Sequence, residues 1–120
     1  MTKEEFAAKA VEYKHSGCNC CQAVVRAFLG DEKRLLSIAS GFGVGMGCME
    51  ATCGALVGAC MVLGEKGKGR CARVLHARFE ELCGGSICGD LKGKSTGIAL
   101  VSCDDCVRNA ALAAAELLDI

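Results

Sequence analysis

The sequence contains no proline and no tryptophan, and only 4% of its 120 residues are aromatic. Because proline is absent, no helix is interrupted by a missing backbone N–H, and the sixteen glycines are left to mark helix ends. Because large rings are scarce, the core has to be built from small aliphatic side chains and cysteine. Such side chains let helices approach one another closely, so both absences favour a tightly packed helical protein.

Net charge and long apolar runs are absent as well. Fourteen basic residues balance fourteen acidic ones, which argues against binding to a nucleic-acid backbone. No apolar run reaches the roughly 18 residues of a membrane span, so no membrane insertion is expected. Residues 1–14 form a charged amphipathic segment unlike a signal peptide, and a cytoplasmic location is therefore expected. A basic stretch over residues 66–78 could dock an acidic redox partner, although a solvated helix face is the simpler interpretation.

Hydrophobic spacing predicts an all-α fold, with one cysteine-rich domain over residues 1–120. We expect a compact bundle of about five to six helices around a central apolar helix that bears cysteines, and no strand. The expected helices cover residues 2–16, 19–30, 31–39, 48–63, 66–83 and 102–118.

Capping residues support the first three helices. Thr2 with Glu5 forms a capping box, Asn19 can cap the second helix, and Asp31 the third. The glycine-alternating segment 41–47 and the glycine-rich segment 86–97 are both predicted to be loops or extended connections.

Eleven cysteines dominate the chemistry of the chain. This density is typical of either a disulfide scaffold or a metal protein. The odd number of cysteines and the expected reducing location favour thiolate chemistry. Cys20 and Cys103 stand at expected helix starts, where the helix dipole lowers a thiol pKa. Cys103 and Cys106 have the C-x-x-C spacing of a shared ligand pair or a dithiol couple.

An iron–sulfur cluster takes about four cysteine ligands, so eleven cysteines could supply one cluster and approach two. The ferredoxin run C-x-x-C-x-x-C is missing, and the ligands would have to be gathered from distant segments. The glycines near residue 45 could bring N–H groups close to cluster sulfurs, or they could serve only tight turns and helix packing.

The cysteine pattern resembles that of the C_GCAxxG_C_C family of cysteine-rich, redox-active proteins. Residues 17–24 are similar to its G-x-N-C-A-Q-A-V segment, with Cys21 in place of the usual alanine. Residues 53–58 match its C-G-A-x-x-G motif, and residues 79–93 and 103–110 are similar to its third and fourth cysteine regions. The resemblance implies a family set of Cys20, Cys53, Cys88 and Cys103. The candidate cofactor-binding glycines are Gly43, Gly45, Gly47 and Gly54.

The remaining cysteines are additional to the family pattern and leave room for a larger or second cluster. Further candidate ligands are Cys18, Cys21, Cys48, Cys60, Cys83 and Cys106. The leading hypothesis is an iron–sulfur electron-transfer protein, with a cluster of the [4Fe-4S] type, that works with a redox partner protein. The alternatives are a Cu(I) or Zn thiolate storage or trafficking protein and a metal-free dithiol–disulfide protein.

Catalysis has less support than binding in this sequence. No paired carboxylates and no Cys–His couple stand out, so an electron carrier is expected rather than an enzyme. A homodimer is a further option, because the basic helix and the glycine-lined apolar segment could form a contact between two copies.

Overall fold

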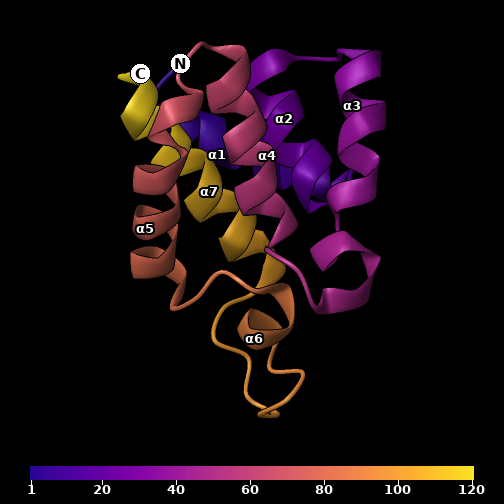
Figure 1. Ribbon diagram of the computed structural model, residues 1–120. Helices are drawn as coiled ribbons and strands as arrows, with labels where there is room; N and C mark the ends of the chain where they lie inside the picture. The colour runs from indigo at the N-terminus through magenta and orange to yellow at the C-terminus, as the bar shows by residue number, and fades with distance from the viewer.

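The computed structural model describes residues 1–120 and contains seven α-helices and no β-strand (Figure 1). The helices are α1 Lys3–His15, α2 Cys20–Leu29, α3 Lys33–Ala39, α4 Gly54–Glu65, α5 Ala72–Cys83, α6 Cys88–Lys92 and α7 Cys103–Leu118. Short helical turns lie between them at Ser40–Phe42, Gly45–Met49 and Gly69–Cys71. The all-α fold predicted from hydrophobic spacing is therefore confirmed, with one helix more than expected.

Helix α7 packs along α1 and against α4 and α5, while α2 contacts α1, α4 and α7. In Figure 1, α5 and α3 lie on opposite sides of this group. The two chain ends lie together at one end of the molecule, and α6 with its long connection lies at the other. The connections that lead into α4, α6 and α7 therefore all lie at the α6 end of the molecule.

The core is built from small side chains, as the composition predicts. Its main part holds 21 buried residues, among which Phe79 and four leucines are the largest and the others are alanine, valine or cysteine. Helix α7 buries five alanines between positions 110 and 115, so its neighbours can lie close to its backbone. None of the helices has the length and apolar character needed to cross a membrane.

The caps predicted for the first two helices are confirmed. The side chains of Thr2 and Asn19 accept hydrogen bonds from the N–H groups of Glu5 and Gln22, and both reciprocal bonds of a capping box are present. The predicted Asp31 cap is wrong. Helix α3 begins one residue later, after Glu32, and has no side-chain cap.

The predicted start of the central helix is also wrong, because α4 begins at Gly54 and not near Cys48. The chain before it forms a π-type turn in which Val44, Met46 and Met49 all have positive φ angles. A left-handed backbone at these residues cannot continue into an α-helix. Hydrophobic character alone had suggested a helix there, and the backbone conformation overrides it.

Two other boundaries differ from the prediction. Helix α5 begins at Ala72, after a turn of 3-10 helix, although the periodic pattern suggested a start near Lys66. The predicted loop over residues 86–97 contains the short helix α6. The glycines on either side of α6 masked it, because glycine weakens any helical pattern.

Candidate thiol site

Backbone hydrogen bonds place Cys53 next to Cys88. The Cys53 N–H donates to the Ser86 carbonyl over 2.7 Å, and the Cys88 N–H donates to the Ala51 carbonyl over 3.0 Å. Thr52 and Ile87 form an isolated antiparallel bridge between these two bonds. The start of α4 and the start of α6 are thereby held side by side.

The start of α7 reaches the same place through the connection that follows α6. The Leu100 N–H donates to the Leu91 carbonyl over 2.8 Å. The Ser102 side chain then caps α7 by accepting a hydrogen bond from the Asp105 N–H over 3.0 Å. This cap orients the first turn of α7, which carries Cys103 and Cys106, toward the junction of α4 and α6.

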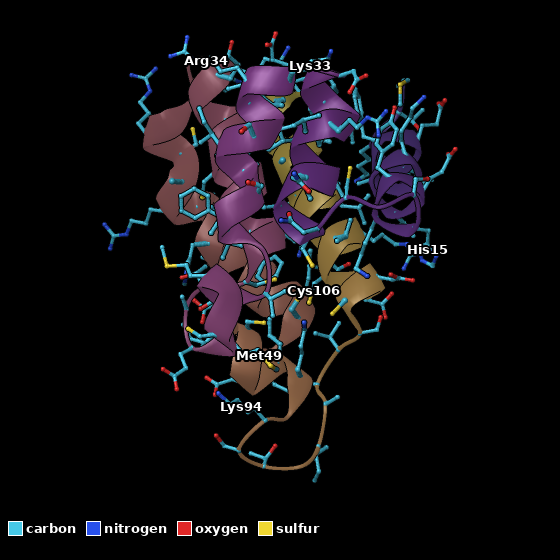
Figure 2. All side chains as sticks on the ribbon, turned by 90° about the vertical axis from the view of Figure 1, so that its right-hand side faces the viewer. His15, Lys33, Arg34, Met49, Lys94 and Cys106 are labelled. Atoms are coloured by element: carbon cyan, nitrogen blue, oxygen red, sulfur yellow. The ribbon has the colours of Figure 1, made fainter.

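Six cysteines meet at this junction, and we call them the six-thiol site. They come from the first residue of α2, the N-cap of α4, the last residue of α5, the first residue of α6 and the first turn of α7. They are Cys20, Cys53, Cys83, Cys88, Cys103 and Cys106. All are buried except Cys103, which is half-buried. Figure 2 shows Cys106 inside the molecule, between the helices and the end that carries Met49 and Lys94.

Cys53, Cys106 and Cys83 interact in a row, with Cys106 in the middle. The Cys106 thiol lowers the pKa of Cys53 to about 7; burial opposes the shift, and the N–H groups of Ala55 and Leu56 add to it. The Cys106 thiol also lowers the pKa of Cys83, whose sulfur accepts a 3.4 Å hydrogen bond from Asn109. The pKa of Cys106 itself is raised, because its S–H group can donate a hydrogen bond to the sulfur of Cys53 or of Cys83. The row therefore favours a thiol at Cys106 beside a thiolate at Cys53 or Cys83.

The other three sulfurs surround Lys92. Burial alone would lower the pKa of Lys92, but Cys103, Cys88 and Cys20 together raise it. Burial raises the pKa of Cys20 to about 11, and the neighbouring Cys103 and Cys53 add to this shift. Burial also raises the pKa of Cys88, against the effect of the Lys92 charge. The Cys20 and Cys88 thiols therefore become anionic readily only when a cation or a metal compensates them.

One expectation about an individual thiol is wrong. Cys20 does not have a lowered pKa, because burial outweighs the favourable position at a helix start. Cys106 interacts with Cys53 and Cys83, whereas Cys103 interacts with Lys92. A shared ligand pair or a dithiol couple formed by Cys103 and Cys106 stays a prediction.

The structure brings together the four family cysteines and two of the additional candidates, and it leaves four candidates outside. Cys21 lies in a separate apolar cluster with Val25 and Ala39, and its sulfur contacts the Met61 sulfur at 3.7 Å. The Cys18 sulfur faces the Arg26 guanidinium at 3.9 Å. Cys48 is exposed and donates to the Gly45 carbonyl, and Cys60 lies at the edge of the main core.

Three of the four candidate glycines stand where another part of the chain leaves no room for a side chain. A Cβ atom at Gly43 would lie 2.6 Å from the Asn19 side chain, and one at Gly54 would lie 2.6 Å from the Phe42 carbonyl oxygen. At Gly45 it would lie 2.6 Å from the Cys88 Cβ. Gly47 faces open space and has a φ of 82°. The close contacts support the packing interpretation of this segment, and a role toward a cofactor stays a prediction.

Two polar residues of the site escaped the sequence analysis. Lys92 follows Cys88 by four residues, which is the spacing of neighbours on one helix face. Asn109 likewise follows Cys106 by three. Both spacings were visible in the sequence, but they gain meaning only when α6 is known to be a helix and Cys83 is known to face α7.

The donor set of the site consists of thiols, without carboxylate or imidazole. In this arrangement no group of three or more Cys, His, Asp and Glu side chains converges closely enough to hold one metal ion. The thiols thus lie as neighbours and do not form a ready-made cage for a single ion.

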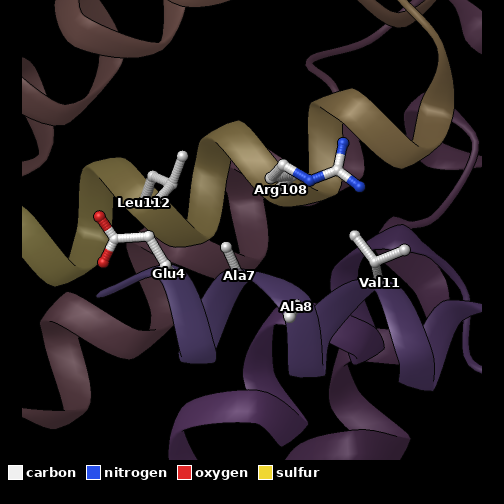
Figure 3. Close-up of a pocket in the computed structure, with 6 residues that line it drawn as sticks. All are labelled: Glu4, Ala7, Ala8, Val11, Arg108 and Leu112. Carbon is white, nitrogen blue, oxygen red and sulfur yellow. The ribbon is translucent and has the colours of Figure 1, made fainter. Parts of the chain in front are cut away.

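Two surface grooves lie apart from the thiols. One, of about 370 Å³, runs between α1 and α7 and is lined by Glu4, Ala7, Ala8, Val11, Arg108 and Leu112 (Figure 3). The other, of about 250 Å³, lies beside α6 and is lined mainly by polar side chains, including Glu50, Asp90 and Lys94. Neither is lined by a cysteine, so the thiol chemistry belongs to the interior of the α6 end.

The fold and this site define a small all-helical protein whose buried thiols come together from several helices, a class suited to redox chemistry. The chain belongs to the C_GCAxxG_C_C family, whose model, described as "Putative redox-active protein (C_GCAxxG_C_C)", matches residues 18–117. The resemblance noted in the cysteine pattern is thereby confirmed, and the match runs from just before α2 almost to the end of α7. No curated protein and no solved structure matches the chain.

Proposed function

We propose that this protein is an iron–sulfur electron-transfer protein whose cluster is bound by Cys20, Cys53, Cys88 and Cys103. The observation that carries the proposal is the six-thiol site, in which all four family cysteines meet although 83 residues of sequence separate the first from the last (103 − 20). Thiolates are the usual protein ligands of iron–sulfur clusters, and four of them complete a [2Fe-2S] or [4Fe-4S] cluster.

The arrangement of the donors supports a cluster over a single ion. A tetrahedral Zn²⁺ with bonds of about 2.3 Å requires its thiolates to converge on one point. The thiols here approach from four different helices and lie as neighbours around a common region. A [4Fe-4S] cluster binds each of its four thiolates at a different iron, and it therefore suits a more widely spread set.

The surroundings of the thiols support electron transfer. Burial, N–H groups near sulfur and a local cation are the means by which proteins set a cluster potential. The site provides all three through its low exposure, the Ala55 and Leu56 N–H groups near the Cys53 sulfur and the Lys92 ammonium. The additional thiols Cys83 and Cys106 adjoin Cys53 and could ligate a larger cluster.

A dithiol–disulfide function is the second candidate, and the row of Cys53, Cys106 and Cys83 favours it. A thiolate at Cys53 beside the Cys106 thiol is the arrangement from which a disulfide forms when an oxidant takes two electrons. Storage of Cu(I) or Zn is the third candidate and rests only on the number of soft donors.

The experiment is anaerobic purification, followed by measurement of iron, acid-labile sulfide, copper and zinc per chain and by the visible absorption spectrum. Iron and sulfide in near-equal amounts, with charge-transfer absorption that bleaches on reduction, are expected. Copper or zinc without sulfide would contradict the proposal in favour of storage. A metal-free protein that forms a Cys53–Cys106 or Cys83–Cys106 disulfide would support the dithiol function instead.

A further inference from the structure

Lys92 is the one cation that faces all four family cysteines. Its ammonium interacts with Cys103, Cys88 and Cys20, and its charge also acts on Cys53. Lys14 also lies near Cys20, but it forms an ion pair with Asp104 at 3.5 Å. The position of Lys92 is therefore central to the thiols, whereas that of Lys14 is peripheral.

The charge of Lys92 has no carboxylate partner. Lys94, two residues later, pairs with Glu50 at 3.8 Å and donates to the Cys48 carbonyl over 3.3 Å, on the outer side of the same segment. Lys92 forms no such ion pair, is half-buried, and has the thiols of Cys103, Cys88 and Cys20 as its neighbours. A half-buried ammonium without a carboxylate is unfavourable unless another anion balances it.

The fold holds Lys92 in place from both sides. It is the last residue of α6, one turn after Cys88, and the adjacent Leu91 carbonyl accepts hydrogen bonds from Leu100 and Val101. Gly93 follows with a φ of 74°, and a Cβ atom there would lie 2.5 Å from the Ile98 carbonyl carbon. The chain thus turns sharply directly after Lys92, and this turn keeps the Lys92 backbone close to the thiols.

We infer that the Lys92 ammonium balances the negative charge of the thiolate-bound cluster and makes the reduced state of the cluster more favourable. The inference rests on the proposed function. In the redox step the cluster accepts one electron from a reductant, such as dithionite in the test, and no bond forms or breaks at Lys92. The added electron raises the negative charge beside a fixed cation, so the attraction is stronger in the reduced state.

The test compares the wild-type protein with Lys92→Met, Lys92→Arg and Lys94→Met, all purified anaerobically. Methionine keeps the apolar stem of lysine without its charge, arginine keeps the charge, and Lys94→Met removes a charge from the same segment outside the site. Iron and sulfide per chain are measured first, and the midpoint potential of the cluster is then measured by titration with dithionite and mediators.

In Lys92→Met the ratio of reduced to oxidised cluster at a fixed potential is expected to fall about tenfold, which equals a midpoint about 59 mV more negative for a one-electron couple. Lys92→Arg and Lys94→Met are expected to stay close to wild type. Equal shifts in Lys92→Met and Lys94→Met, or no shift in Lys92→Met, would overturn the inference.

Loss of the cluster from the neutral variant is also informative. If Lys92→Met keeps its helical circular dichroism but binds no iron, while Lys92→Arg and Lys94→Met bind it, the charge is required to hold the anionic cluster and the inference is supported. If Lys92→Met and Lys92→Arg both lose it, shape and not charge matters, and the inference is wrong. Wild-type protein without iron and sulfide would overturn the proposed function itself, a result distinct from an unshifted potential.

Discussion

Gly58 of α4 lies directly against the main chain of Cys21 in α2. A Cβ atom at position 58 would be 2.6 Å from the Cys21 carbonyl oxygen and 3.2 Å from its Cα atom. The 2.6 Å distance is shorter than normal contacts of a Cβ atom and 3.2 Å is tighter than most, and the neighbour is backbone, which cannot rotate away. The approach of α2 to α4, and with it the position of Cys20 near Cys53, depends on the absence of a side chain here.

Gly58→Ala is therefore expected to lower the free energy of unfolding by about 1–3 kcal/mol, because the two helices must separate. Gly64→Ala is the matched control in the same helix, since a Cβ atom at position 64 meets nothing within 4 Å. That control should be neutral or stabilising by up to about 1 kcal/mol, as alanine is the better helix former. Urea unfolding of the metal-free proteins measures both, and equal effects would contradict the packing role of Gly58.

The comparison of sequence and structure shows where local signals are sufficient. Asn19 predicts the start of α2 correctly, because the cap, which the structure completes with Gln22 as a capping box, is formed within four consecutive residues. The start of α4 could not be predicted in this way, because it depends on the bridge between Thr52 and Ile87. Partners 35 residues apart (87 − 52) leave no local trace in the sequence.

The site divides in the same manner. The family pattern indicated four of the six cysteines that the structure brings together. The C-x-x-C spacing indicated Cys106, but nothing local to Cys83 distinguished it from Cys18 or Cys60. Cys83 and Cys106 meet because α5 packs against α7. A lowered pKa is predicted for Cys20, but the structure has it at Cys53. The reason is similar, since the Cys106 thiol that lowers the pKa of Cys53 comes from another helix.

The turn before α4 stores backbone strain that a glycine should relieve. Val44 has a φ of 53°, in the left-handed region that a β-branched residue enters at a penalty of about 1–2 kcal/mol, and 44% of it is exposed. Val44→Gly removes this penalty, while the greater freedom of glycine in the unfolded chain offsets about 0.5–1 kcal/mol. The net expectation is a stabilisation of up to about 1 kcal/mol.

The control for this prediction is Val74→Gly. Val74 is similarly exposed, at 56%, but it lies in the regular helix α5. There glycine should destabilise the protein by about 1 kcal/mol. Thermal unfolding of both variants separates the two effects, and a Val44→Gly protein that loses as much stability as Val74→Gly would show that the strain is not relieved.

The pKa of Cys53 should depend on Cys106. In the reduced, metal-free protein, Cys53 is expected to ionise near pH 7, and Cys106→Ala should raise this pKa toward the ordinary thiol value because the main favourable neighbour is lost. Cys106→Ser keeps a donor and should retain part of the lowering. Ultraviolet absorbance of the thiolate as a function of pH follows the ionisation, with Cys71→Ala as a control outside the site.

The sign of the linked stability follows from the direction of this shift. A thiol whose pKa is lower in the folded state than in the unfolded state contributes stability that is fully present above the unfolded pKa, near 9, and is lost as the pH falls through about 7. The metal-free wild type should therefore gain stability between pH 7 and 9 relative to Cys53→Ala. A parallel pH dependence of the two proteins would contradict the assignment.

Serine substitutions should separate ligands from bystanders, because serine preserves size but is a poor ligand for iron. Cys88→Ser is expected to reduce iron and sulfide per chain several-fold, since Cys88 belongs to the family set and its neighbours include Cys53 and Cys103. Cys48→Ser is the control. Cys48 lies in the turn that packs against Cys88 through Gly45, but its sulfur is exposed and bonds only to the Gly45 carbonyl.

The double variant Cys83→Ser with Cys106→Ser decides how large the cluster is. If Cys20, Cys53, Cys88 and Cys103 are sufficient, the double variant should retain wild-type iron and sulfide, because these two thiols then only adjoin the ligand Cys53. Its midpoint potential should still change, since the neighbours of the Cys53 sulfur are altered. A loss of one or more whole iron atoms per chain from the double variant would instead show that both thiols are ligands of a larger cluster.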